Sequence, residues 1–240
     1  MRALGRSRVF ASRGNCDNRC SCSTLVGHIP RIGVRISSFT CTSPSFSIVP
    51  VQPAALELLA DLSKVLAGWG RWYVFGAQAV IAYGVPRLSA DVDVTVRLSP
   101  EDPERFSTAM HAAGFALRVD DPDFVRRTRV MPFVHLATAM PVDVVLAASG
   151  LEDEFLDRAR VVDIGGTSVP LIEPEDLVIA KVLAGRPKDL EDARSLWRIR
   201  GPELDADRIH RTLRLLEEAL SQSDLVPSFE SIRQGGAGRG

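Results

Sequence analysis

The chain has 240 residues, of which 45% are hydrophobic and 25% are charged, a composition typical of a globular protein large enough to bury a core. It contains no run of about 18 apolar residues, which argues against a membrane-spanning helix. The net charge is −1, yet residues 1–50 hold seven arginines and one acid, so the remaining chain holds 22 basic and 29 acidic residues. This acidic body argues against nonspecific nucleic-acid binding over the whole surface.

Residues 1–50 are rich in Ser, Arg, Gly and Thr and show no sustained apolar periodicity, so we expect a disordered or mis-started extension. An organellar transit peptide is an alternative. All four cysteines lie here, and their C-x3-C-x-C spacing is not that of a usual zinc site. The cysteine-free body fits a reducing, cytoplasmic location.

The following segment, residues 51–172, alternates between helical and extended patterns. Apolar residues at helical spacing predict a helix from Pro53, and the pattern after it predicts a strand over 72–75, a helix over 77–83, a strand over 91–96 and a helix starting at Pro100. Four short runs then predict a β-meander over 115–119, 124–130, 133–138 and 141–147. A short helix over 152–159 and a hairpin around Gly165-Gly166 follow.

The remaining chain is predicted to be helical. We expect helices over 173–183 and 187–199 and a last amphipathic helix with an apolar stripe, which together form a small C-terminal region over 173–225. Residues 226–240 are predicted to be a flexible tail, since they end in a glycine-rich run.

Two aspartates mark the strand over 91–96. Side chains in a strand alternate between its faces, so Asp91 and Asp93 point to one side and the intervening valines to the other. Two carboxylates on one face repel each other unless a cation lies between them. The pair is therefore a candidate metal site.

A third carboxylate, Asp143, interrupts an otherwise apolar strand, Val142 to Leu146. Burial of a lone carboxylate is costly, and a metal shared with Asp91 and Asp93 would offset that cost. The alternative is an aspartate that faces solvent at a strand edge.

These groups suit polyphosphate chemistry. Two Mg²⁺ ions, or Mn²⁺, held by three carboxylates can bridge a nucleoside triphosphate and activate an attacking hydroxyl. Backbone amides after Gly76, at a helix start, can hold phosphate oxygens, and Lys181 can add a positive charge for the triphosphate.

The spacing Gly76-x7-Gly84-x2-Arg87-x-Ser89-x-Asp91-x-Asp93 resembles the first motif of the nucleotidyltransferase superfamily with the polymerase β-type fold. Within it, the chain is similar to the branch of AbiEii-like toxins and small bacterial nucleotidyltransferases. Asp143 lies where that superfamily has its third carboxylate. The downstream segment resembles the AbiEii-like motif through its residues Lys181, Lys188, Asp189 and Asp192.

The resemblance implies an α+β (α/β mixed) nucleotidyltransferase fold, a mixed β-sheet flanked by helices, followed by a small C-terminal helical region. It also implies an enzyme that transfers an NMP from an NTP to a hydroxyl and releases pyrophosphate. Asp91, Asp93 and Asp143 would hold the metals, and Asp143 would also act on the acceptor hydroxyl. The residues expected near the nucleotide are Gly76, Ala77, Arg87, Ser89, Lys181, Lys188, Asp189 and Asp192.

Several alternatives stay open. Asp189 and Asp192 could instead cap or salt-bridge their own helix. Ala77 stands where the superfamily often has Ser or Gly, which leaves only backbone amides for phosphate and suggests a non-catalytic nucleotide-binding or regulatory protein as an alternative. The acceptor could be RNA or protein, as for a toxin with a cognate antitoxin, or a small antibiotic.

Overall fold

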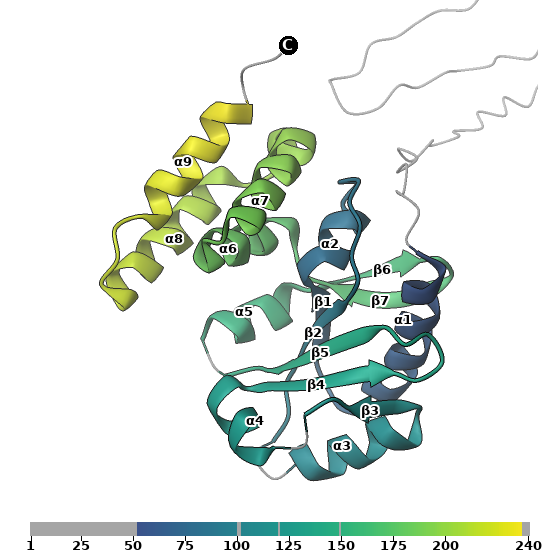
Figure 1. Ribbon diagram of the computed structural model, residues 1–240. Coiled ribbons are helices and arrows are strands. Elements are labelled where there is room, and N and C mark those ends of the chain that lie inside the picture. Colours follow the sequence, from purple (N-terminus) through teal and green to yellow (C-terminus); the bar gives the residue numbers. More distant parts are fainter. Residues whose placement is uncertain (1–51, 100–101, 120, 149, 237–240) are drawn as a thin grey trace, which may run out of the picture. The chain divides into compact units, whose positions relative to one another are not determined.

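The centre of the protein is a mixed β-sheet (Figure 1). The computed structural model describes residues 52–99, 102–119, 121–148 and 150–236, which belong to one compact unit. Within them, seven strands pair in the order β3-β4-β5-β2-β1-β7-β6. The strands are β1 (Trp72–Phe75), β2 (Val92–Val96), β3 (Phe115–Leu117), β4 (Val130–His135), β5 (Pro141–Leu146), β6 (Arg160–Ile164) and β7 (Thr167–Leu171).

The central strand pairing explains the valine pattern of the sequence. β2 runs antiparallel to β1 and parallel to β5, with Val94 opposite both Val74 and Val144. All three valines are fully buried, so one face of the central strands packs into the apolar core. The expected mixed sheet in an α+β fold is confirmed.

Helices flank this sheet (Figure 1). They are α1 (Pro53–Leu66), α2 (Gly76–Ala82), α3 (Pro103–Ala112), α4 (Pro122–Thr128) and α5 (Leu151–Arg158). In α1, Pro53 lies in the first turn, where its missing N–H costs no helical bond, and buried leucines at 58, 59, 62 and 66 form its apolar face. This helix packs against β7.

The C-terminal part consists of helices that pack on one another (Figure 1). They are α6 (Pro174–Ala184), α7 (Pro187–Arg200), α8 (Ala206–Leu220) and α9 (Leu225–Gly236), with a 3-10 turn, η1 (Gly201–Glu203), after α7. Contacts between α2 and α6 join these helices to the sheet. Among the helices described, none is long and apolar enough to cross a membrane.

Three predictions about these elements are wrong. The run predicted as a strand over 124–130 is mostly α4, because Asp121 accepts a hydrogen bond from the Asp123 amide and Pro122 favours a first helical turn. The helix expected from Pro100 begins at Pro103, since proline inside a helix lacks the N–H that the ladder needs.

The third wrong prediction is the flexible tail over 226–240, where α9 occupies residues 225–236. Phe229 and Ile232 of this helix are fully buried, and the Phe229 ring meets the Trp197 ring edge-on at 5.3 Å between centroids. The predictions for residues 1–50, including their four cysteines, lie outside the described residues.

Candidate active site

The sheet places Asp93 and Asp143 side by side. Val92, Val94 and Val96 are fully buried, which turns Asp93 toward the opposite face of β2. In the parallel pairing of β2 with β5, Asp93 lies directly opposite Asp143. Residues opposite each other in a sheet share a face, so the pairing register brings together two carboxylates that are 50 positions apart in sequence.

Gly76 gives the carboxylate of Asp93 its space. A Cβ at this position would lie 1.9 Å from Asp93 Oδ2 and 2.8 Å from Asp93 Cγ. Gly76 also has φ +63°, in the left-handed region that glycine adopts without a steric penalty. The carboxylate therefore packs directly against the backbone that opens α2, next to the buried Ala77.

Asp91 is held from two sides. Ser89 Oγ lies 2.8 Å from Asp91 Oδ1 and 3.1 Å from its carbonyl oxygen, and Gln78 Nε2 donates to the same carbonyl at 3.1 Å. Gln78 is buried, and its Oε1 has no partner within the described part of the chain. Gln78 was not predicted as a site residue, although a lone amide in the apolar helix Gly76–Ala82 is a usable signal.

Asp143 has a counter-ion that was also missed. The Arg118 guanidinium donates to Asp143 Oδ1 through Nη2, while its Nε donates to the Phe133 carbonyl at 3.0 Å. Arg118 follows β3, and only the pairing of β3 with β4 and of β4 with β5 brings it to Asp143. No local sequence pattern indicates this contact.

Asp93 is an aspartate of this group whose pKa is strongly affected by its surroundings. Burial raises the pKa of Asp93 to about 6, and the charges of Asp91 and Asp143 act in the same direction. Lys181 and Lys188 partly offset this effect. The three aspartates thus form one electrostatically coupled group, and a cation among them would relieve the repulsion.

Lys181 belongs to a buried ion network. Its Nζ lies 2.8 Å from both Asp189 Oδ1 and Asp192 Oδ2, and all three residues are at most 9% exposed. Arg186 pairs with Asp189, and Arg87, in the loop before β2, pairs with Asp192. Burial acts to raise the pKa of Asp189, but the hydrogen bonds from Arg186 and Lys181 lower it below the ordinary value.

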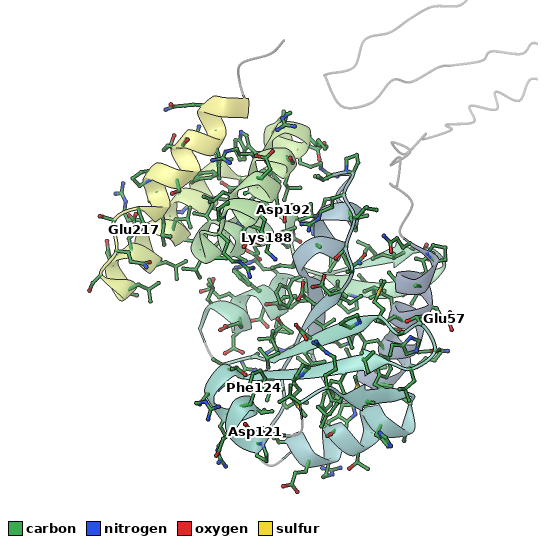
Figure 2. The ribbon with its side chains drawn as sticks, viewed as in Figure 1. Glu57, Asp121, Phe124, Lys188, Asp192 and Glu217 are labelled. Atoms are coloured by element: carbon green, nitrogen blue, oxygen red, sulfur yellow. The ribbon has the colours of Figure 1, made fainter. Side chains whose placement is uncertain are left out.

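Lys188 differs from Lys181 in having an exposed side chain. Figure 2 labels it on α7 together with Asp192. Within the described ranges Lys188 has no ion-pair partner, yet its charge lowers the pKa of Asp93. It is therefore a cation close to the carboxylates that is not committed to another side chain.

The residues fit a divalent cation by donor type and charge. Carboxylate oxygens are the ligands that Mg²⁺ prefers, and the raised pKa of Asp93 reflects first its burial and then the negative charges of Asp91 and Asp143. As the side chains lie, no group of three His, Cys, Asp or Glu residues in the described segments is arranged to hold a metal ion. Asp143 is turned to Arg118 and Asp91 to Ser89, so coordination requires these side chains to reorient.

Three solved structures of low sequence identity resemble the chain. ANT(2'')-Ia in complex with adenylyl-2''-tobramycin is 15% identical, with a TM-score of 0.47, covering 70% of this chain and 98% of that one. JHP933 from Helicobacter pylori is 14% identical (TM-score 0.44, 78% and 95%). An antigenic nucleotidyltransferase-like protein from Paracoccidioides brasiliensis is also 14% identical (TM-score 0.46, 77% and 94%).

A search of curated proteins found no match to this chain. A family model described as "Nucleotidyltransferase of unknown function" (DUF6036) matches residues 70–214. That range covers more than half of the 240 residues and contains Asp91, Asp93 and Asp143. The protein therefore belongs to this nucleotidyltransferase family and is a nucleotidyltransferase enzyme.

Proposed function

We propose that the protein transfers a nucleoside monophosphate from an NTP to a hydroxyl group, with Asp91, Asp93 and Asp143 holding divalent cations, Mg²⁺ or Mn²⁺. The observation that carries this proposal is the register of β2 and β5, which sets Asp93 beside Asp143 on one face, two residues from Asp91. When bound, the cations would supply charge neutralisation for the phosphates and for the attacking oxygen.

In the proposed reaction, Asp143 and Asp93 have different roles. The acceptor oxygen forms a bond to the α-phosphorus, the bond from that phosphorus to the bridging oxygen breaks, and pyrophosphate leaves. Asp143, whose side chain is 36% exposed, takes the hydroxyl proton. Asp93, packed against Gly76, keeps its position through the reaction because the backbone confines it.

We assign the triphosphate contact to Lys188 in place of Lys181. The charge of Lys181 is taken up by Asp189 and Asp192, whereas Lys188 is exposed and close enough to Asp93 to lower its pKa. A free ammonium group binds phosphate as a point charge. Backbone amides of Gly76 and Ala77 remain candidates for further phosphate contacts.

Arg87 and Ser89 serve in this proposal as supports of the site. Arg87 is engaged by Asp192 and Ser89 by Asp91, so both fix the loop that leads into β2. Their part is to hold Asp91 in place, and the contact to phosphate falls to groups without a partner of their own.

The test is labelling with each of the four α-³²P NTPs and Mg²⁺, in the presence of total RNA, a protein extract or an aminoglycoside. We expect label to move to one acceptor class, and to be lost by at least about a hundredfold in Asp93→Asn and Asp143→Asn. Asp207→Asn, an exposed position on α8, is the matched control. Full transfer by Asp93→Asn would refute the proposal.

The acceptor also tests the biological role that the family resemblance implies. Label on RNA or protein, together with growth arrest on expression that a neighbouring gene relieves, would support a toxin with a cognate antitoxin. Label on the aminoglycoside alone would support antibiotic modification instead.

A further inference from the structure

Arg118 lies in the same transverse row of the sheet as the candidate metal ligands. Its amide donates to the Pro132 carbonyl at 2.8 Å, Pro132 lies opposite Asp143, and Asp143 lies opposite Asp93. Residues opposite each other across paired strands project from the same face. The row therefore carries one guanidinium and two carboxylates on one side of β3, β4, β5 and β2.

Pro132 explains how the arginine reaches across a strand. β4 lies between β3 and β5, so a side chain on β4 separates Arg118 from Asp143. Proline has a short ring, and Pro132 is buried. The longer Arg118 side chain extends past it to Asp143, and its Nε is anchored on the Phe133 carbonyl.

We propose that Arg118 is the internal counter-ion of Asp143, which a divalent cation must displace before Asp143 can act as a ligand. This inference rests on the proposed function and adds a residue that sets the cation affinity of the site. Among the residues that the structure describes, Asp93 has no such counter-ion, and the neighbouring charges of Asp91 and Asp143 repel it. Arg118 thus substitutes for part of the cation's charge when no cation is bound.

The ion pair between Arg118 and Asp143 is weak enough to be displaced. The Arg118 side chain is 39% exposed and the Asp143 side chain 36%, so water screens their attraction. An exposed ion pair of this kind is weak enough for a divalent ion with several oxygen ligands to replace it. Removing Arg118 should therefore tighten cation binding about threefold to fivefold.

The test is a titration with Mn²⁺ in the absence of nucleotide, in which the electron paramagnetic resonance signal of free Mn²⁺ measures binding. We expect Arg118→Met to bind Mn²⁺ about threefold to fivefold more tightly than the unchanged protein, and Arg118→Lys to lie between the two. Lys188→Met is the matched control, since it also removes one positive charge near Asp93 but breaks no ion pair in the described chain. Lys188→Met should tighten Mn²⁺ binding less than Arg118→Met does.

A second comparison isolates the partner. In an Asp143→Asn background, Arg118→Met should no longer tighten Mn²⁺ binding, because the competing pair is already gone. Unchanged or weaker binding by Arg118→Met, or an equal gain in Lys188→Met, would overturn the inference while leaving the proposed function intact. Failure of the unchanged protein to bind Mn²⁺ would instead refute both.

A measurement of thermal stability distinguishes a direct effect of Arg118→Met on Mn²⁺ binding from an effect that arises because the substitution disturbs the fold. Without cation, Arg118→Met should melt at a lower temperature than the unchanged protein, and saturating Mn²⁺ should remove most of that difference. A deficit that persists at saturating Mn²⁺ would mean that Arg118 serves the sheet and does not compete with the cation.

Discussion

Gly76 and Asp93 are linked by sterics as much as by chemistry. The glycine combines φ +63° with a carboxylate oxygen placed where its Cβ would be. Any side chain at this position must both adopt a strained backbone conformation and push Asp93 out of place. The glycine of the first motif is thus explained by a contact to the aspartate that ends the same motif.

Gly76→Ala should therefore cost stability and cation binding together. We expect a loss of at least about 1–2 kcal/mol in the free energy of unfolding, from the left-handed backbone alone, and weaker Mn²⁺ binding from the displaced carboxylate. Urea unfolding and Mn²⁺ titration measure the two effects. Gly68→Ala is the control, because a Cβ there meets only the Val65 carbonyl at 3.7 Å; equal losses in both variants would contradict the explanation.

Asp93 also makes the stability of the cation-free protein depend on pH. Its pKa is raised from 3.8 to about 6, so its protonated form is favoured in the folded state. The stability that this protonation contributes is fully present below about pH 4 and is lost as pH rises through about 6. In the presence of a chelator, the free energy of unfolding of Asp93→Asn, relative to that of the unchanged protein, should rise by about 2–3 kcal/mol from pH 4 to pH 7.

Urea unfolding of both proteins in parallel isolates the Asp93 site, since carboxylates remote from Asp93 contribute equally to both curves. The ordinary trend is opposite in sign: Asp189, with its lowered pKa, contributes stability that is lost as pH falls below about 4. A difference between the two proteins that stays constant from pH 4 to pH 7 would show that neither burial nor the neighbouring carboxylates raise the pKa of Asp93 in the folded protein.

At the scale of elements, the sequence pattern predicted the helices and strands that local interactions determine. The helix over 53–66, the strand at 72–75 and the hairpin of β6 and β7 follow from periodicity and glycine turns. The helix α4 was not predicted because Val, Phe and Arg occur in either state, and it is the Asp121 cap that selects the helix. The α9 helix was missed because its apolar spacing is short and its glycine-rich end suggested a tail.

The same limit applies to the site. Asp91 and Asp93 could be predicted as a pair from the alternation of strand side chains, although β2 begins at Val92 and Asp91 directly precedes it. The contact between Arg118 and Asp143 could not, because it depends on pairing across three strands and on the small ring of Pro132 between them. Lys181 is a related case: its spacing indicates a cation near the site, but only the fold shows two buried aspartates around it.

At the scale of the molecule, the buried ion network ties the C-terminal helices to the loop that precedes β2. Arg87 belongs to the loop that delivers Ser89 and Asp91, and Asp192 belongs to α7. Lys181 of α6 completes the connection through Asp192. The helical region thereby gains a function beyond covering apolar surface, since its charges hold the loop that supports Asp91.

This connection should appear as energetic coupling between Arg87 and Asp192. Their side chains are 27% and 11% exposed, and the carboxylate also faces Lys181, so the pair is only partly screened. We expect the single variants Arg87→Met and Asp192→Asn and the double variant to give a coupling free energy of about 1–3 kcal/mol in urea unfolding. The same cycle on Arg126 and Asp123, an exposed pair within α4, should give below about 0.5 kcal/mol. Additive effects at Arg87 and Asp192 would mean that the helices and the loop are held independently, and Asp192→Asn would then leave Mn²⁺ binding at Asp91 unchanged.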